Sequence, residues 1–470
     1  MITLPVQLRR ILSATPALRH SYLVGGCVRD AILGLPQKDY DVEVHGLGFD
    51  QLEAALSRWG GTDVVGRSFG TVKLNLVSGE SYDFSLPRRA SKIGAGHRGF
   101  KVEIDPNLEP GEASARRDFT INSMMWDTAK GELLDFHGGL KDLQSKTLRH
   151  TSPAFTEDPL RVLRGMQFIS RFELTAAAET LELCRSMVGS HSELAAERIE
   201  GEWRKWASDS RKPSLGLRWL KDTGWIVHYP EIAALDNVPQ DSQWHPEGDV
   251  FIHTQHTCDA MASLPEWKAL PSEDRAVYML AILCHDMGKP STTRTEMRAN
   301  QERIISPSHE AAGVPLAEAF LERLHQPLAI RKRITPLVAN HMVNSPDWTP
   351  RAVRRLAHRL MPETIDGLTV VMKADAFGRP PLPQVVPRNI TALITAADAM
   401  SIRHAPPQPI LLGRHLLHIG WKAGREMGEA LKAAYDAQLE GDFDTVEGAC
   451  AWAQAWKHSR TSGESANGQV

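Results

Sequence analysis

Cysteine is scarce and long apolar runs are absent from this chain of 470 residues. Its five cysteines form no Cys-x-x-Cys pair, which argues against a disulfide framework and is typical of reduced thiols in a cytoplasmic protein. No apolar stretch approaches the length needed to cross a bilayer, and the N-terminus shows no signal-peptide pattern. We therefore expect a cytoplasmic protein without a membrane partner.

An excess of either charge is also absent, since the formal net charge is −3 at pH 7. Binding of nucleic acid over the whole surface is therefore excluded, and any such surface must be a local basic patch. Apolar residues make up 42% and charged residues 24% of the chain, both ordinary values for globular proteins. The length exceeds what one hydrophobic core supports, so we expect about two to four domains.

Residues 22–44, YLVGGCVRDAILGLPQKDYDVEV, contain the first candidate site. A short apolar strand leads into Gly25 and Gly26, whose lack of side chains lets backbone N–H groups approach phosphates. A second strand begins near Asp39 and Asp41, which strand alternation places on one face. Paired carboxylates repel each other unless a cation lies between them, and oxygen ligands suit Mg²⁺. Either motif alone is usually a turn or solvated surface, but together they predict a metal-dependent nucleotidyl-transfer site.

Three further segments add polar groups suited to a nucleotide. Asp83 lies on a predicted strand and is either a third carboxylate of this site or an exposed strand residue. The run RRDFTIN (116–122) combines forked donors for a triphosphate with an acceptor for a ribose hydroxyl. Asp158, Arg161 and Arg164 are spaced three apart along one face of a predicted helix. An acceptor beside a donor mimics a base edge and can select C or A without a template, although an intrahelical ion pair is the alternative.

The joint order of these motifs resembles the nucleotidyltransferase superfamily and, within it, the class II tRNA nucleotidyltransferases. That branch contains the CCA-adding enzymes and bacterial poly(A) polymerases. The resemblance extends to about residue 230. The matching segments are LVGGCVRD (23–30), KDYD (38–41), RRDFTIN (116–122), DFHGGLKDL (135–143), EDPLRVLR (157–164) and ERIEGE (197–202).

The resemblance implies a role for each matched residue. Asp39 and Asp41 would be catalytic and hold Mg²⁺. The implied nucleotide-binding residues are Gly26, Arg29, Arg117, Asp158, Arg161 and Arg164. Of these, Asp158 and Arg161 would read the base. Relatives commonly carry another arginine where this chain has Gln167, and the effect of that departure on nucleotide choice stays open.

A second candidate site follows residue 243, where the motifs change. Its residues are His253, His285, Asp286 and Asp375. Imidazole and carboxylate together suit borderline and hard cations, and adjacent His285 and Asp286 can share one metal. A lone histidine is more often a buried core residue, but this H…HD…D set resembles the HD phosphohydrolases, with His309 and His341 as further pocket residues. The resemblance implies Ni²⁺, Mn²⁺ or Co²⁺ and hydrolysis of phosphoesters, including 2′,3′-cyclic phosphates.

We predict an α+β fold with a small mixed-sheet head followed by an all-α remainder. The expected parts are a nucleotidyltransferase head (1–150), a helical neck with the base-selecting motif (151–240), an HD domain (241–385) and a C-terminal helical region (386–470) with a disordered tail after residue 459. Within the head, the basic, glycine-rich segment 88–100 is expected to be a loop. Residues 243–247 also resemble the start of the HD domain in multifunctional bacterial CCA proteins.

The predicted function is template-independent addition of C and A from CTP and ATP to the 3′ end of tRNA, with an HD phosphohydrolase activity. One alternative is a poly(A) polymerase or an enzyme that adds only CC or only A. Another is a phosphodiesterase or phosphatase whose head merely binds RNA, and a non-enzymatic scaffold is disfavoured because both metal sets are complete. The sequence leaves the oligomeric state open. Candidate tRNA-contacting positions, or else solvated helix faces, are Arg331, Lys332, Arg333, Arg351, Arg354 and Arg355.

Overall fold

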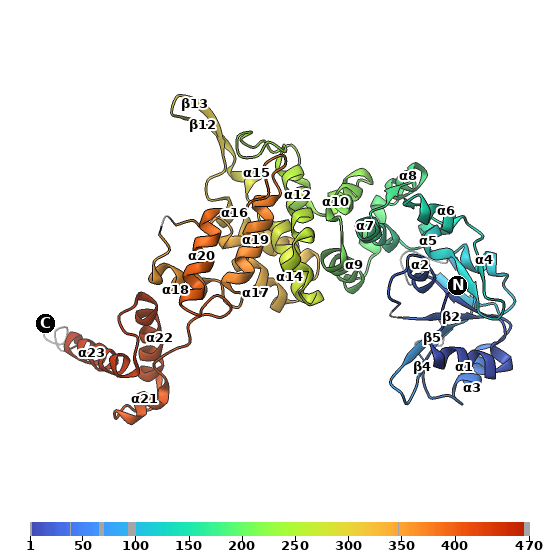
Figure 1. The fold of residues 1–470 in the computed structure, drawn as a ribbon, viewed down its shortest axis with the longest axis horizontal. Coiled ribbons are helices and arrows are strands. Elements are labelled where there is room, and N and C mark those ends of the chain that lie inside the picture. Colours follow the sequence, from blue (N-terminus) through green and yellow to red (C-terminus); the bar gives the residue numbers. More distant parts are fainter. Residues whose placement is uncertain (1, 38, 65–69, 93–99, 346, 465–470) are drawn as a thin grey trace. The chain divides into compact units, whose positions relative to one another are not determined.

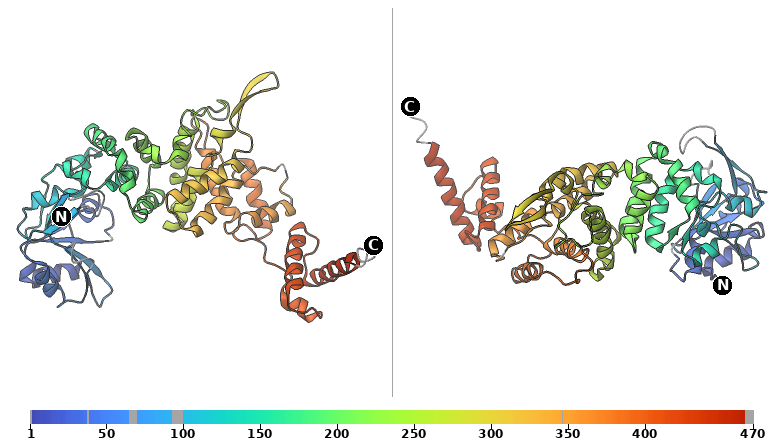
Figure 2. Two further views of the ribbon diagram at one scale, coloured as in Figure 1. Left: turned by 180° about the vertical axis from the view of Figure 1, so that it is seen from behind. Right: turned by 90° about the horizontal axis from the view of Figure 1, so that it is seen from above.

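The computed structural model describes the whole chain except residues 1, 38, 65–69, 93–99, 346 and 465–470. The chain forms two compact units, Met1–Pro230 and Glu231–Val470. A sheet dominates part of the first unit, whereas the second is mostly helical (Figures 1 and 2). Within the described residues, no helix has both the length and the apolar character required to cross a membrane. The four-part domain division stays a prediction.

The sheet of the first unit has seven strands in the order β3-β4-β5-β2-β1-β8-β9. Strands β2 and β5 run parallel, whereas the other neighbouring strands pair antiparallel. This mixed sheet confirms the predicted α+β class. The strands are β1 (Ser21–Val24), β2 (Asp41–Val44), β3 (Gly61–Val64), β4 (Thr71–Asn75), β5 (Ser81–Ser85), β8 (Met125–Asp127) and β9 (Glu132–Leu134).

The turn between β1 and helix α2 depends on a glycine. Gly25 has a φ of +74°, a left-handed conformation that residues with a Cβ adopt only with strain. This turn lets α2 (Gly26–Ile32) begin immediately after β1. A Cβ on Gly25 would lie 3.4 Å from the guanidinium of Arg117. The other head helices are α1 (Val6–Ala14), α3 (Phe49–Leu56), α4 (Pro110–Ser114), α5 (Thr120–Ser123) and α6 (Gly139–Gln144).

Helix α7 (Leu160–Phe172) joins the sheet-containing part to the helices that follow it. The ring of Phe119 packs edge to face against Phe155 and Phe168, at centroid distances of 5.4 and 5.8 Å. Trp219 Nε1 donates a hydrogen bond of 2.9 Å to the carbonyl of Val162 in α7. Head and neck therefore share one core. The remaining helices of this part are α8 (Ala178–Ser186), α9 (Ala196–Asp209) and α10 (Pro213–Asp222).

Helix α14 (Ser272–Cys284) forms the centre of the second unit and packs against α12, α13, α17 and α19. Every residue from 276 to 284 is buried, as expected for a helix surrounded by other helices. The other helices are α11 (Pro230–Ala233), α12 (Val250–Ser263), α13 (Pro265–Lys268), α15 (Lys289–Thr292), α16 (His309–Arg323), α17 (Leu328–Asn340), α18 (Pro350–Arg359), α19 (Ile365–Phe377), α20 (Arg388–Ala399), α21 (Gly413–His418), α22 (Arg425–Glu440) and α23 (Val446–Glu464).

Four features differ from the sequence-based expectation. The predicted loop at 88–100 contains strand β6 (Arg88–Lys92), which pairs antiparallel with β7 (Phe100–Ile104), while residues 93–99 lie outside the description. The second unit carries an unexpected hairpin, β12 (Arg294–Arg298) with β13 (Gln301–Ile305), which extends away from the helices of its unit in Figure 1. A short parallel pair, β10 (Thr147–Leu148) with β11 (Thr175–Ala176), lies in the first unit. Helix α23 continues past the predicted tail boundary to Glu464, and the rest of the tail lies outside the described residues.

Candidate functional site

The first unit contains a cavity of about 1070 Å³. Its wall includes the turn after β1, strands β2 and β5, residues 116–118 and helices α7 and α9. Among the described residues, nine arginine or lysine side chains and six carboxylates line it. This excess of positive charge suits a polyanionic ligand such as a triphosphate.

Two carboxylates from adjacent strands face this cavity. Asp41 on β2 is the register partner of Asp83 on β5, and both line the cavity. Burial raises the pKa of Asp41, and the negative charge of Asp83 raises it further. Strand β2 begins at Asp41, so Asp39 lies before it. The side chain of Asp39 is exposed and does not line the cavity. The structure thus brings Asp41 together with Asp83, and this pair fits a divalent cation that would relieve the repulsion.

Two predicted phosphate-binding arginines have different surroundings. Arg29 is 4% exposed and donates to Asn122 Oδ1 at 2.5 Å and to Asp30 Oδ1 at 2.7 and 2.9 Å, so it forms part of the wall. Arg117 donates to Glu43 Oε2 at 3.0 Å, while its buried Nε has no hydrogen-bond partner. Arg117 lines the cavity, and its guanidinium keeps N–H groups beyond the one bound to Glu43. Gly26 lines the cavity, as predicted for a close backbone approach.

Asp118 holds Arg164 in place. Its carboxylate accepts hydrogen bonds from Arg164 Nε at 2.7 Å, from Asn122 Nδ2 at 3.0 Å and from the backbone N–H of Phe119 at 2.7 Å. Burial alone would raise the pKa of Asp118, but the charge of Arg164 and these hydrogen bonds hold it below its usual range. Asp118 was predicted to accept from a ribose hydroxyl, and in the structure its carboxylate orients Arg164.

Asp158 and Arg161 both line the cavity, but each is fixed by another group. Asp158 lies before α7 rather than on its face, and it accepts two hydrogen bonds from Arg198, at 3.0 and 2.7 Å. Arg161 donates to the carbonyls of Ala154 at 2.7 Å and Arg116 at 2.6 Å. Oδ1 of Asp158 also accepts from the backbone N–H of Leu160 at 3.2 Å, whereas Oδ2 keeps a second lone pair, and Arg161 keeps further N–H groups. An acceptor and a donor therefore remain for a ligand.

Sequence reasoning did not assign two charged partners that complete this site. Glu43 lies two residues after Asp41 on the same face of β2, accepts from Arg117 and lies 3.0 Å from Nε2 of His45, so the period of the strand was the available signal. Arg198 lies in the ERIEGE segment, which was interpreted only as wall support. Other basic residues that line the cavity without having been predicted are Arg88, Arg116, Arg171 and Lys205.

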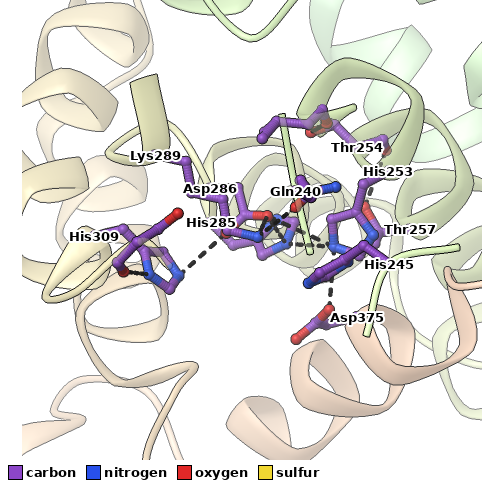
Figure 3. A network of polar contacts seen from close by, with 12 residues as sticks. Gln240, His245, His253, Thr254, Thr257, His285, Asp286, Lys289, His309 and Asp375 are labelled. Atoms are coloured by element: carbon purple, nitrogen blue, oxygen red, sulfur yellow. Dashed lines mark hydrogen bonds and ion pairs between the residues drawn. The ribbon is translucent and has the colours of Figure 1, made fainter. Parts of the chain in front are cut away.

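The four predicted ligands of the second site meet in the second unit, as Figure 3 shows. His253 comes from α12, His285 and Asp286 follow α14, and Asp375 comes from α19. Nε2 of His253 lies 3.2 Å from Asp375 Oδ1 and 3.4 Å from Nε2 of His285. His253, His285 and Asp375 each present one ligand atom within 4.8 Å of the others, which fits a metal ion.

A second layer of polar groups orients these ligands. Glu247 Oε1 accepts from Nδ1 of His253 at 2.7 Å and from Nδ1 of His245 at 2.9 Å, which leaves Nε2 of His253 facing the cluster. Although burial opposes it, hydrogen bonding to these two rings lowers the pKa of Glu247 to about 2. Lys289 Nζ lies 2.6 Å from Asp286 Oδ2 and donates to Gln240 Oε1 at 2.8 Å. The sequence had not singled out Glu247 or Lys289 for these roles.

Several basic residues proposed for RNA contact are engaged within their own unit. Arg333 pairs with Asp274 at 2.7 Å and with Glu363, and both Arg351 and Arg355 pair with Glu440. A role for these positions in RNA binding therefore stays a prediction.

Comparisons with known proteins identify relatives of both units. Residues 21–149 match the poly A polymerase head domain family, and residues 250–379 match the HD domain family. A multifunctional CCA protein of Xanthomonas campestris pv. campestris is 38% identical over 76% of this chain and 85% of its own length. The corresponding protein of Pasteurella multocida is 36% identical over 77% of this chain and 85% of its own length.

Solved structures share the fold at low sequence identity. The CCA-adding enzyme of Bacillus stearothermophilus in complex with CTP has a TM-score of 0.63, 19% identity and coverage of 98% of this chain and 100% of its own. The CCA-adding enzyme of Thermotoga maritima complexed with tRNA has a TM-score of 0.54, 18% identity and coverage of 95% of each chain. The relative that is 38% identical and covered over 85% of its length, together with the head and HD domain matches, shows that the chain belongs to the multifunctional CCA protein family.

Proposed function

We propose that this chain adds C and A nucleotides from CTP and ATP to the 3′ end of tRNA without a nucleic-acid template. The observation that carries this proposal is the pair of Asp41 and Asp83 in a basic cavity that also contains Asp158 and Arg161. Its relatives are named multifunctional CCA proteins, and solved neighbours are CCA-adding enzymes complexed with CTP, ATP or tRNA.

In the proposed reaction, the 3′-hydroxyl oxygen of the RNA bonds to the α-phosphorus of the nucleotide. The bond from that phosphorus to the bridging oxygen breaks, and pyrophosphate leaves. Asp41 and Asp83, which line the cavity, would hold Mg²⁺, which supplies Lewis acidity when bound. Arg117 lines the cavity and offers guanidinium N–H donors to the phosphates, and Arg164, fixed by Asp118, presents positive charge beside it.

Base selection follows from the hydrogen-bonding pattern of Asp158 and Arg161. Cytosine and adenine both present an exocyclic amino donor next to a ring-nitrogen acceptor, which a carboxylate and a guanidinium complement. Uracil and guanine present the reverse pattern and would leave these polar groups unpaired, at a cost of about 1–3 kcal/mol. Arg198 and the backbone carbonyls that bind Arg161 hold the two groups in position before a nucleotide arrives.

The proposal is tested with tRNAs that end at the discriminator base, at C and at CC. Each is incubated with one labelled nucleotide and Mg²⁺, and the products are sized on a gel. We expect CTP to extend the first two substrates and ATP only the third. Addition of C alone or of A alone would support a partial enzyme, and a long A tract would support a poly(A) polymerase. Absence of any addition would reject the proposal.

A second activity is proposed for the HD cluster, hydrolysis of small phosphoesters such as 2′,3′-cyclic phosphates. The supporting observation is that His253, His285, Asp286 and Asp375 converge with Glu247 behind them. Their mixed imidazole and carboxylate atoms favour Ni²⁺, Mn²⁺ or Co²⁺ over Mg²⁺. Hydrolysis of 2′,3′-cyclic AMP and p-nitrophenyl phosphate is measured with each of these cations. No hydrolysis with any of them would reduce the cluster to a structural role.

We also infer a cytoplasmic location. The cysteines Cys27, Cys184, Cys258, Cys284 and Cys450 are all free thiols, which supports a reducing compartment. Labelling of the chain in fractionated cells tests this inference.

A further inference from the structure

His45 is a buried histidine of the head that has no part in the reaction proposed above. It directly follows β2 and is 8% exposed. Nδ1 of its ring lies 2.9 Å from the carbonyl oxygen of Leu108, and Nε2 lies 3.0 Å from Oε1 of Glu43. The ring also packs edge to face against Tyr22, at a centroid distance of 5.1 Å. Together these contacts fix the orientation of the imidazole.

The contact between His45 and Glu43 requires a proton. Because a carbonyl oxygen only accepts, Nδ1 of His45 donates to Leu108. If neither partner of the second contact carried a proton, the lone pair of Nε2 would face a carboxylate oxygen at 3.0 Å, and the two would repel each other. A hydrogen bond therefore joins the two side chains, and burial strengthens it, since Glu43 is only 7% exposed.

Glu43 connects this histidine to the wall of the cavity. Its backbone is paired on both sides, with Tyr22 of β1 and with Ser85 of β5. Oε1 faces His45, whereas Oε2 accepts a hydrogen bond of 3.0 Å from Nη2 of Arg117. Because each oxygen has its own partner, rotation of the carboxylate would break a hydrogen bond. His45 therefore fixes Glu43, and Glu43 fixes the guanidinium of Arg117.

The guanidinium of Arg117 is held beside the glycine turn that follows β1. A Cβ on Gly25 would lie 3.4 Å from Nη1 of Arg117 and 3.9 Å from Oδ2 of Asp41. Arg117 and both of these neighbours line the cavity, whereas His45 does not. A phosphate that approaches the backbone of the turn would therefore also meet this guanidinium.

We propose that His45 is a positioning residue for nucleotide addition, which acts through Glu43 to hold Arg117 against the phosphates of the incoming nucleotide. The inference rests on the function proposed for this cavity and deepens it. A side chain that is held in place before the ligand arrives loses little freedom on binding, so the affinity for the triphosphate is higher. Binding of tRNA does not involve these phosphates and should not depend on His45.

Binding of Mg²⁺-pyrophosphate and Mg²⁺-CTP to the full-length chain tests this role in the absence of tRNA. His45→Phe keeps a ring against Tyr22 but removes both hydrogen bonds, and the smaller His45→Leu removes the same bonds. By isothermal titration calorimetry, we expect either substitution to raise the dissociation constants of both ligands roughly tenfold, which corresponds to one lost hydrogen bond. The matched control His20→Phe changes an exposed histidine just before β1 and should leave both constants unchanged.

The kinetics of addition to tRNA give a second readout, which reports on the head alone. The KM for CTP should rise by the same factor in both His45 variants, whereas the KM for tRNA should stay unchanged. In an Arg117→Met background, His45→Phe should have no further effect on the KM for CTP, because the residue through which it acts is already gone. Thermal unfolding establishes that each variant is folded. Additive effects of the two substitutions would overturn the proposal, as would an unchanged KM for CTP in a folded His45 variant.

These outcomes also distinguish the role of His45 from the function of the cavity. Binding of pyrophosphate and CTP that depends on His45, without any addition to tRNA, would reject the proposed function and leave the phosphate contact standing. Normal addition of C and A with a KM for CTP that does not depend on His45 would reject the positioning role alone.

Discussion

At the scale of single residues, the Asp41–Asp83 pair concentrates like charge where a cation is needed. The two residues are opposite each other in parallel strands, and burial together with Asp83 raises the pKa of Asp41. Asp83→Asn should lower the rate constant of nucleotide addition by roughly 100-fold or more, because even outer partners of metal ligands contribute 10–100-fold. The control is Asp63→Asn, which alters an exposed carboxylate of β3. Near-normal addition by the Asp83 variant in Mg²⁺ would remove Asp83 from the site.

Gln167 offers a separate prediction about nucleotide binding. Its side chain is 2% exposed and lines the cavity, and its Oε1 is buried without a hydrogen-bond partner. If a nucleotide donates to this oxygen, Gln167→Met should raise the KM for CTP or ATP roughly tenfold, which corresponds to one lost hydrogen bond. The Tm should be unchanged or higher, because the unpaired acceptor is removed. An unchanged KM for both nucleotides would contradict the prediction.

The sequence could predict which residues gather at the first site more readily than how they pair. Asp41, Arg117 and Arg161 belong to local motifs whose residue types suit phosphate, metal or base. Their partners come from distant segments, as in the bond from Arg198 to Asp158 across 40 residues. Such pairs depend on how α7 packs against α9. Strand alternation grouped Asp39 with Asp41, but β2 does not extend back to Asp39.

At the scale of elements, helix α9 controls the base-selecting pair through Arg198. Burial would raise the pKa of Asp158, and hydrogen bonding from Arg198 is the main effect that lowers it. Arg198→Met should therefore raise the pKa of Asp158. The carboxylate would then be protonated, and lost as an acceptor, at a higher pH than in the wild type, so the acidic limb of the pH–rate profile should shift to higher pH. Discrimination of CTP and ATP from UTP and GTP should weaken by roughly tenfold at neutral pH.

A matched substitution on the same helix provides the control. Arg204 is more exposed than Arg198 and pairs with Glu200 one turn earlier along α9. Arg204→Met should leave both the pH profile and the nucleotide preference unchanged. An identical acidic limb in the Arg198 variant and the wild type would show that Arg198 does not set the ionisation of Asp158.

The strands that the sequence missed lack the pattern that reveals a strand. No residue of β12 or β13 is buried, so neither shows the alternation of apolar and polar residues that a packed sheet imposes. Their turn places Ala299 and Asn300 at positive φ, 47° and 63°, without the glycine that usually marks such a turn. The strands β1, β2 and β5, which pack in the sheet of the head, show their apolar residues clearly and were predicted.

At the scale of the whole molecule, shared cores explain how the chain divides. The sequence predicted a head and a neck as separate parts, but Phe119, Phe155 and Phe168 pack together across that boundary within one unit. A change of motifs near residue 243 lies close to the division at Pro230 and Glu231. A motif indicates which reaction its residues suit, whereas the extent of a compact unit depends on packing between distant segments. The sequence could therefore locate the two candidate sites better than the boundaries of the two units.

The two proposed activities belong to different units and should be lost separately. Asp286→Ala removes the carboxylate that lies within 3.2 Å of Nε2 of both His285 and His309, so phosphoester hydrolysis with Ni²⁺, Mn²⁺ or Co²⁺ should disappear. Addition of C and A to tRNA in Mg²⁺ should be unchanged, because the cavity around Asp41 has its own carboxylates and its own core. Asp41→Ala should give the opposite pattern, and both variants are assayed in parallel with thermal unfolding as the control for folding. Loss of tRNA extension in a folded Asp286 variant would show that the HD cluster supports the head reaction, and the independence of the two sites would then be wrong.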